Sequence, residues 1–188
     1  TTTGITYDDS EENAKALLTL LSIESYRFTK PSGQAYIFCG KTNFSWLKDT
    51  MEAAGWLVFQ WPIVWTKRET GQNNQPERWP SAAYESILFA RKPDAKLILQ
   101  GRPDWMQCDI VLPSVRIHQA EKPVTLLKEL IARTSEPGHI LVDPFMGSGA
   151  IIEAACEMKL IASGCELSIE AYAGAVRRMK EWKERSKV

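Results

Sequence analysis

The residues best placed for chemistry lie in a short turn in the last third of the chain. Asp143 ends a run of apolar residues, and the glycines Gly147 and Gly149 follow it. A helix is predicted from Ala150, and the next apolar run ends in Glu166. This order is typical of nucleotide-type cofactor sites, because glycines allow a tight turn and a helix N-terminus presents free N–H donors.

The carboxylate of Asp143 bears on which cofactor the turn suits. A dinucleotide is one candidate, but the G-x-G-x-x-G fingerprint is incomplete, because Ile152 stands where the third glycine is required. A carboxylate directly before the turn also repels a pyrophosphate, whereas it attracts a cationic or amine-bearing ligand. S-adenosylmethionine carries a sulfonium, an ammonium and a ribose, so the electrostatics favour it.

Strands and helices alternate along the chain, which predicts an α/β fold with a mostly parallel sheet. Helix starts are expected at Ser10, Asn43, Pro123, Ala150 and Ser168, and strands at 35–39, 57–66, 84–90, 139–143 and 160–166. The continuous apolar run 35–39 predicts a strand buried on both faces, as in a parallel sheet. The strands 57–66 and 84–90 have no helical pattern between them and should pair antiparallel, with Pro62 at an edge or a bulge. Residues 93–117 show only a weak pattern.

The composition is that of an average globular protein, with 44% hydrophobic and 24% charged residues among 188. Because 23 basic residues balance 23 acidic ones, binding to nucleic acid would need a local basic patch or a motif. No apolar run is long enough to span a membrane, and no signal-peptide pattern begins the chain. The four cysteines fall in no paired spacing, so we expect free thiols, no metal site and a cytoplasmic protein.

Three ordered motifs resemble those of a known enzyme family. The string VDPFMGSGA at residues 142–150 resembles cofactor-binding motif I of the DNA amino-methyltransferases, which modify adenine at N-6 or cytosine at N-4. The string HQAEKP at residues 118–123 is similar to motif X of the permuted, β-type members. Residues 63–67 and 84–92 resemble the two strands that those enzymes place before motif X. The chain is identified as a member of this family from about Ile5 to Lys183.

The resemblance implies a Rossmann-like three-layer sandwich whose mostly parallel sheet contains one antiparallel strand. The family's strand order is 3-2-1-4-5-7-6, with strand 1 at residues 139–143 and strand 5 at residues 35–39. Strands 3 and 4 have no counterpart in this chain. Without strand 4 the sheet is expected to split at its centre and to leave two rows of backbone groups unpaired.

A single methyltransferase domain is expected over the whole chain. Residues 1–92 would form its catalytic-side half and residues 118–188 its cofactor-binding half. Residues 93–117 would be a short DNA-contact segment, which predicts a short or relaxed recognition sequence.

The cofactor implied by the resemblance is S-adenosylmethionine. Its methionine end would lie against Asp143, Phe145, Gly147 and Gly149, and Glu166 would bind its ribose. The full set of predicted cofactor residues is His118, Lys122, Pro123, Asp143, Pro144, Phe145, Gly147, Ser148, Gly149 and Glu166. Ordinary roles stay open for them, such as glycines that shape a turn, an exposed acid at a strand end, a solvated lysine at a helix start or a histidine that makes a polar contact.

Catalysis in this family is implied to need a loop that the sequence lacks. An Asp/Asn/Ser-Pro-Pro-aromatic tetrad accepts hydrogen bonds from the target amino group and stacks on the flipped base. The one Asp-Pro-aromatic string here, residues 143–145, belongs to the cofactor turn. The catalytic residues are therefore unknown, and we expect the tetrad upstream of Thr1. A truncated remnant and complementation by another segment are the alternatives.

The implied partner is double-stranded DNA, contacted by the loop 67–80 and the segment 93–116. Candidate phosphate contacts are Lys67, Arg68, Arg78, Arg102 and Arg116, although such charges often lie on an ordinary solvated surface.

The expected function is methyl transfer from S-adenosylmethionine to the amino group of adenine or cytosine in DNA. We expect a monomer or a homodimer of bacterial or phage type, as in restriction-modification. A non-catalytic remnant that binds only DNA or cofactor is the main alternative, and RNA or a protein amide is an alternative substrate. Methylation of a cytosine ring carbon is disfavoured, because it needs a Pro-Cys loop and no Pro-Cys occurs.

Overall fold

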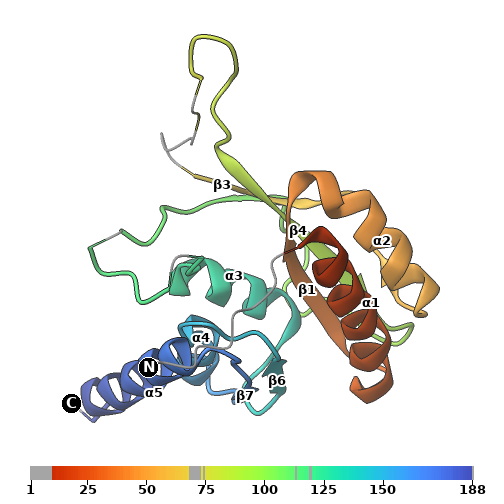
Figure 1. The fold of residues 1–188 in the computed structure, drawn as a ribbon. Coiled ribbons are helices and arrows are strands. Elements are labelled where there is room, and N and C mark those ends of the chain that lie inside the picture. The colour runs from red at the N-terminus through yellow and green to blue at the C-terminus, as the bar shows by residue number, and fades with distance from the viewer. Residues whose placement is uncertain (1–9, 68–72, 74, 113, 119, 188) are drawn as a thin grey trace. The chain divides into compact units, whose positions relative to one another are not determined.

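The computed structural model describes residues 10–67, 73, 75–112, 114–118 and 120–187. The chain divides into two compact units (Figure 1). The first consists of Thr1–Lys96 and Pro103–Gln107, and the second of Leu97–Arg102 and Cys108–Val188. Each unit contains a sheet of its own. Among the described residues, no helix combines the length and the apolar character that crossing a bilayer requires.

The first unit is a five-stranded sheet with two helices on one of its faces. The sheet has the order β1-β4-β3-β5, and β2 also pairs with β4. Its strands are β1 (Gln34–Cys39), β2 (Leu57–Val58), β3 (Ile63–Thr66), β4 (Tyr84–Arg91) and β5 (Trp105–Gln107). The helices are α1 (Glu11–Phe28) and α2 (Phe44–Ala53), and the short 3-10 helix η1 (Lys41–Asn43) precedes α2.

A single strand, β4, runs against the others in this sheet. It pairs antiparallel with β1, β2 and β3, for example Ile37 with Leu88 and Ile63 with Ile87. Strands β3 and β5 pair parallel, with Trp65 opposite Met106. The expected α/β sheet with one antiparallel strand is therefore confirmed.

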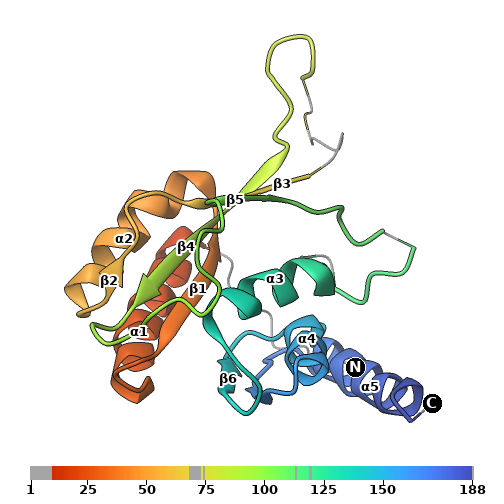
Figure 2. The same ribbon diagram turned by 180° about the vertical axis from the view of Figure 1, so that it is seen from behind.

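The core of the first unit lies between this sheet and its two helices. Leu47 and Met51 of α2 pack with Trp56, and Leu88 and Ala90 of β4 complete the buried cluster. The indole N–H of Trp56 donates a 3.2 Å hydrogen bond to the carbonyl of Ser22 in α1, so the largest core side chain also ties the two helices together. Figure 2 shows the other side of this unit, with β1 and β4 in front of α1.

The second unit contains a two-stranded parallel sheet and three helices. Strand β6 (Ile140–Asp143) pairs in register with β7 (Ile161–Gly164). The helices are α3 (Val124–Thr134), α4 (Ala150–Glu157) and α5 (Ile169–Arg185). Helix α4 contacts both α3 and β7, and α5 packs against α4.

The predicted helix starts are confirmed within one residue. The hydroxyl of Ser10 accepts a hydrogen bond from the N–H of Asn13 at 3.4 Å, and that of Ser168 accepts one from Ala171 at 3.2 Å. Pro123 occupies the N-cap of α3. Asn43 occupies the N-cap of α2, but its side chain makes no capping hydrogen bond.

Three expectations about strands need correction. The predicted strand 57–66 is interrupted and forms β2 and β3, because Pro62 lies between them. Strand β1 was expected to be buried on both faces, yet all of its residues are only half-buried. Strand β5 was missed, because it has three residues and follows Pro103 in a stretch without periodicity. The expected split of the sheet is confirmed, since β6 and β7 form a sheet separate from β1.

Candidate functional site

The glycine-rich turn lies between the end of β6 and the start of α4. Gly147 has φ 50° and Gly149 has φ 75°, in the left-handed region that side chains disfavour. A Cβ on Gly149 would lie 2.9 Å from the Cβ of Ala175 in α5. Glycine is therefore needed at 149 both for the backbone conformation and for the close approach of α5.

Glu166 fixes this turn from the end of the neighbouring strand. Its Oε2 accepts a hydrogen bond from the N–H of Gly147 at 2.9 Å, and its Oε1 accepts one from Ser168 at 2.7 Å. Backbone hydrogen bonds reinforce the link, because the N–H of Met146 donates to the carbonyl of Cys165 at 3.0 Å. The turn and the two strand ends therefore form one hydrogen-bonded unit around Glu166, the residue predicted to bind the ribose.

Asp143 is half-buried at the start of the turn. Its Oδ1 accepts a hydrogen bond from the N–H of Phe145 at 2.8 Å. Burial raises the pKa of Asp143, against the opposing effect of that N–H, and the nearby Glu166 carboxylate raises this pKa further. Positive charge brought to this point would favour the ionised carboxylate, so the two acids suit a cationic ligand. Phe145 beside them is 49% exposed, whereas Ser148 is buried.

His118 lies beside the turn, as the motif X resemblance implies. A Cβ on Gly147 would be 3.8 Å from Nδ1 of His118. The same Nδ1 accepts a hydrogen bond from the N–H of Ala120 at 3.2 Å, so the ring is held by its own segment. Further along, Lys122 is half-buried and Pro123 is buried at the start of α3.

A buried ion pair holds the His118 segment on α5. The Oε2 of Glu121 accepts hydrogen bonds from the backbone N–H groups of Ile117 and His118, at 2.9 and 3.4 Å. Its Oε1 is bonded to the guanidinium of Arg178, and the two side chains are 3% and 11% exposed. The same guanidinium lies 3.5 Å from the carboxylate of Glu153 in α4.

Sequence reasoning missed this ion pair, because nothing local connects Glu121 with Arg178. It also missed the contact of Gly174 with Ile117, where a Cβ on the glycine would lie 2.5 Å from the Ile117 Cγ2. A glycine inside an otherwise helical pattern was the available signal for that contact. Both features position the segment that carries His118.

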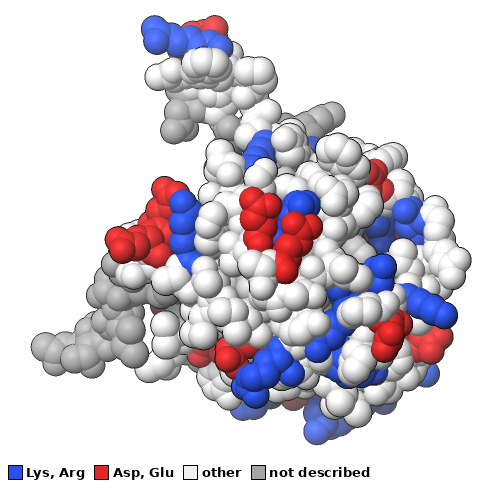
Figure 3. Space-filling model, turned by 90° about the vertical axis from the view of Figure 1, so that its right-hand side faces the viewer, with Lys and Arg blue, Asp and Glu red and all other residues white. Residues whose placement is uncertain are grey.

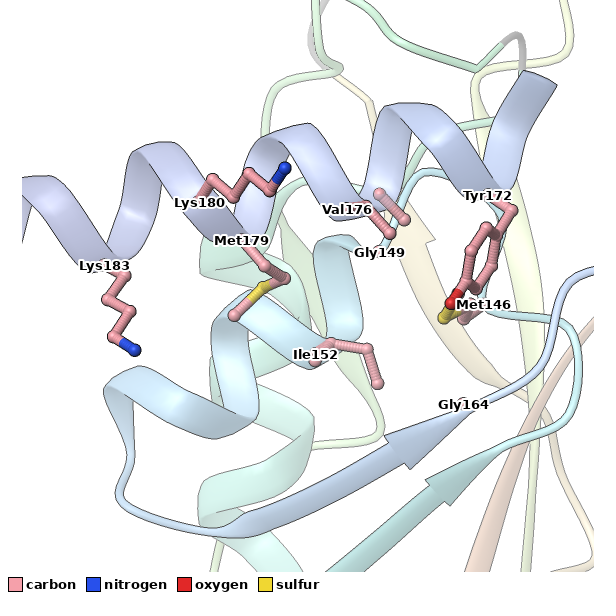
Figure 4. Close-up of a pocket in the computed structure, with 10 residues that line it drawn as sticks. Met146, Gly149, Ile152, Gly164, Tyr172, Val176, Met179, Lys180 and Lys183 are labelled. Atoms are coloured by element: carbon pink, nitrogen blue, oxygen red, sulfur yellow. The ribbon is translucent and has the colours of Figure 1, made fainter. Parts of the chain in front are cut away.

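A mostly apolar cavity of about 390 Å³ lies between α4, α5 and the end of β7. Figure 4 shows Ile152 of α4 and Met179 of α5 facing this space, with Tyr172 and Met146 together at one end. Of the predicted cofactor residues, only Gly149 lines it. The cavity therefore adjoins the turn but does not coincide with the carboxylate site.

The five predicted phosphate contacts do not form one cluster within either unit. Lys67 and Arg78 belong to the first unit, Arg102 and Arg116 belong to the second, and Arg68 lies outside the described residues.

Three of the five predicted phosphate contacts lie close to an acidic side chain. Lys67 pairs with Glu85 at 2.7 Å, and Arg102 makes a two-pronged contact with Glu129 at 3.0 and 3.1 Å. Arg78 lies 3.6 Å from Glu77. On the face shown in Figure 3, basic and acidic side chains are also interspersed.

In the part of the chain that the structure describes, the two-stranded sheet of the second unit has an unpaired edge at β6 and exposes apolar side chains. Among the described residues, β6 pairs with β7 alone. Ile140 and Ile161 are opposite each other and 71% and 61% exposed, and Val142 is 51% exposed. Unpaired strand edges and exposed apolar faces of this kind are typical of surfaces that other polypeptide covers.

Comparison with known proteins identifies close relationships over most of the chain. The N6/N4 methyltransferase family model, described as "DNA methylase", matches residues 4–177. YubD of Escherichia coli (strain K12), whose name describes it as a methylase, is 30% identical over 164 residues, which cover 83% of this chain and 66% of YubD. The type II methyltransferase M.HpaI of Haemophilus parainfluenzae is 23% identical over 179 residues, which cover 83% of this chain and 56% of M.HpaI.

The chain thus spans less than two thirds of the length of these curated relatives. Its fold matches the crystal structure of an M1.HpyAVI–SAM complex with a TM-score of 0.73 and 25% identity. That match covers 86% of this chain and 82% of M1.HpyAVI. The S-adenosylmethionine-dependent methyltransferase fold expected from the sequence is therefore confirmed.

Proposed function

This chain belongs to the N6/N4 DNA methylase family, and on that premise we propose that it binds S-adenosylmethionine and acts in methyl transfer to an exocyclic amino group of DNA. The observation that carries the proposal is the pair of carboxylates at the glycine turn. Asp143 and Glu166 stand at the ends of adjacent parallel strands, and burial raises the pKa of Asp143. The carboxyl ends of parallel strands are the usual ligand-binding edge of α/β sheets.

Each residue of the turn has a defined part in this proposal. When bound, S-adenosylmethionine supplies an electrophilic methyl group. The carboxylate of Asp143 attracts the cationic end of the cofactor, and Glu166 accepts hydrogen bonds from ribose hydroxyls while it holds the N–H of Gly147. Phe145 offers an exposed aromatic surface beside them, and His118, Lys122 and Pro123 are proposed to flank the cofactor. Pro144 and Ser148 shape the turn.

The catalytic loop is proposed to come from additional polypeptide. The sequence contains no Asp/Asn/Ser-Pro-Pro-aromatic string, and β6 has an open edge among the described residues. A parallel strand added there would pair with the backbone groups at the edge of β6, and its carboxyl end would lie at the same end of the sheet as Asp143. A Pro-Pro-aromatic loop after that strand would then lie near the cofactor turn.

The substrate is proposed to be double-stranded DNA, with adenine N-6 or cytosine N-4 as the acceptor. The zero net charge means that binding depends on local contacts, for which Lys67, Arg68, Arg78, Arg102 and Arg116 are the candidates. We propose that the two units act together as one domain, as a monomer or a homodimer. The four free thiols are consistent with the reducing cytoplasm. A restriction-modification role is proposed by analogy with M.HpaI, a type II methyltransferase.

Methyl transfer from tritiated S-adenosylmethionine to DNA tests this function. We expect the 188-residue chain to bind the cofactor without transferring the methyl group, and a fusion that adds an N-terminal strand with an Asp-Pro-Pro-Tyr loop to transfer it. The same fusion with Ala-Pro-Pro-Ala in the loop is the matched control. Transfer by the chain alone would refute the proposed incompleteness, and failure to bind the cofactor would refute the cofactor site.

The alternative is a remnant that binds DNA or cofactor without catalysis. The fusion separates it from the leading proposal, because a remnant would stay inactive with the loop in place. Product analysis of methylated nucleosides would then assign adenine or cytosine.

A further inference from the structure

A half-exposed tyrosine lies under a lysine at one end of the sheet in the first unit. The ammonium of Lys41 lies 3.6 Å from the centroid of the Tyr84 ring, and Tyr84 is 42% exposed. The other three such contacts in the described chain range from 4.2 to 5.7 Å, so this one is the closest. A cation over an aromatic face at this distance is a favourable contact that also leaves both groups within reach of solvent.

The strand register explains why these residues meet. Cys39, the last residue of β1, pairs with Ser86 of β4. Lys41 begins η1, two residues after β1 ends, and its ammonium lies over the ring of Tyr84, the first residue of β4. On its other side Tyr84 pairs with Thr66, the last residue of β3. The contact therefore lies at the carboxyl ends of β1 and β3, the edge where α/β sheets usually bind ligands.

The two lysines at this sheet end differ in their surroundings. The ammonium of Lys67 pairs with Glu85 at 2.7 Å, so its charge is already balanced. Within the described part of the chain, the contact of Lys41 is the Tyr84 ring. Lys41 therefore brings positive charge to the exposed aromatic surface.

From this geometry we infer that Tyr84 and Lys41 form a nucleotide contact for the DNA substrate. The Tyr84 ring stacks on an unpaired base, and the Lys41 ammonium pairs with an adjacent phosphate. A nucleotide fits both side chains, because its aromatic base and its anionic phosphate are joined through one sugar. Stacking of bases on aromatic side chains, with little dependence on sequence, is common in proteins that hold single strands. The inference rests on the proposed function, since it assigns residues that hold the DNA of that reaction.

Binding of a fluorescein-labelled single-stranded DNA oligonucleotide to the full chain, followed by anisotropy, tests this contact. Tyr84→Leu should weaken binding about 10-fold, because it removes the aromatic surface on which one base stacks. Tyr84→Phe keeps the ring and should bind within about twofold of the parent chain. Phe28→Leu is the matched control, because Phe28 is an aromatic of similar exposure at the end of α1 and should have no effect.

The Lys41→Met variant supplies an independent readout. Removing one phosphate contact should lower the slope of log affinity against log salt by about 0.7 for a single strand. Urea unfolding of each variant shows whether the first unit keeps its stability. Unchanged binding by Tyr84→Leu, an equal loss in Tyr84→Phe or Phe28→Leu, or an unchanged salt slope in Lys41→Met would overturn the inference.

Cofactor titration separates this inference from the proposed function. A chain that binds S-adenosylmethionine but no oligonucleotide would overturn the nucleotide contact and leave the cofactor site standing. A chain that binds the oligonucleotide through Tyr84 but not the cofactor would support the contact and refute the proposed function.

Discussion

The N–H of Gly147 donates a 2.9 Å hydrogen bond to Oε2 of Glu166, across the gap between the ends of two parallel strands. The carboxylate of Glu166 therefore has two roles. It holds the turn in a left-handed conformation at Gly147, and it is the group that we propose binds the ribose of the cofactor. The shape of the turn therefore depends on the acid that would also recognise the ligand.

Replacing this acid should weaken both the turn and the binding of cofactor. Glu166→Ala removes hydrogen bonds to Gly147 and Ser168, and charged hydrogen bonds of this kind contribute about 1.5–3 kcal/mol each. We expect urea unfolding to show a loss of about 2 kcal/mol or more, and Glu166→Gln to lose less because its amide oxygen still accepts one bond. Glu170→Ala on the exposed first turn of α5 is the control. Equal stability of Glu166→Ala and Glu170→Ala would contradict this assignment.

Two glycines with similar backbone angles should respond differently to alanine. Gly149 and Gly138 have φ 75° and 86°, so alanine at either should cost about 1–2 kcal/mol in strain. Only at Gly149 does the new Cβ meet a neighbour, Ala175 at 2.9 Å, which should add about 1–3 kcal/mol. Comparing the two variants by urea denaturation isolates the packing of α5 on the turn. No difference between them would mean that α5 does not approach the turn as described.

Breaking the buried ion pair should greatly lower the free energy of unfolding, although the pair lies outside the glycine turn. Arg178→Met leaves the carboxylate of Glu121 buried without its cation, which should cost about 3–5 kcal/mol. Arg177→Met, at the exposed neighbouring position, should change the free energy of unfolding by less than about 0.5 kcal/mol. Because Glu121 and Arg178 act as a pair, Arg178→Met combined with Glu121→Gln should lose less than the sum of the single losses. A strictly additive double-mutant cycle would rule out the coupling.

Asp143 predicts a pH dependence of stability that its amide variant lacks. Its pKa is raised in the folded chain, so folding favours the protonated form. The stability that this group contributes is present at acid pH and is lost as the pH rises through the usual aspartate range to the raised value. Asp143→Asn should therefore gain stability relative to the parent chain as the pH rises through that window. Parallel stability curves, measured by urea unfolding across the acid range, would show that the carboxyl does not titrate as described.

Much of the fold could be predicted because local signals and packing agree. Ser10, Ser168 and Pro123 mark helix starts that the structure keeps, and the two glycines at 147 and 149 mark the turn. The resemblance to the methyltransferase family implied the split sheet, since strand 4, which lies between strands 1 and 5 in that family, has no counterpart in this chain.

The remaining features depend on contacts between distant residues. β5 is short and is defined by its pairing with β3, and Glu121 meets Arg178 only through tertiary packing. The apolar run 35–39 predicted a strand buried on both faces, yet every residue of β1 is only half-buried. An apolar run indicates hydrophobic character but does not reveal which neighbours cover the two faces of the strand. The roles of the predicted site residues and of the five basic residues stay predictions.

The central claim is that the carboxylate-flanked turn binds a positively charged methyl donor. Calorimetric titration of the full chain with S-adenosylmethionine, with NAD as the competing ligand and Asp143→Asn as the variant, tests it most directly. We predict one site for S-adenosylmethionine, no binding of NAD, and affinity lowered about 10–100-fold in Asp143→Asn, as expected for the loss of a charged hydrogen-bond partner. Binding of NAD in preference to S-adenosylmethionine, or equal affinity in the variant, would contradict the claim.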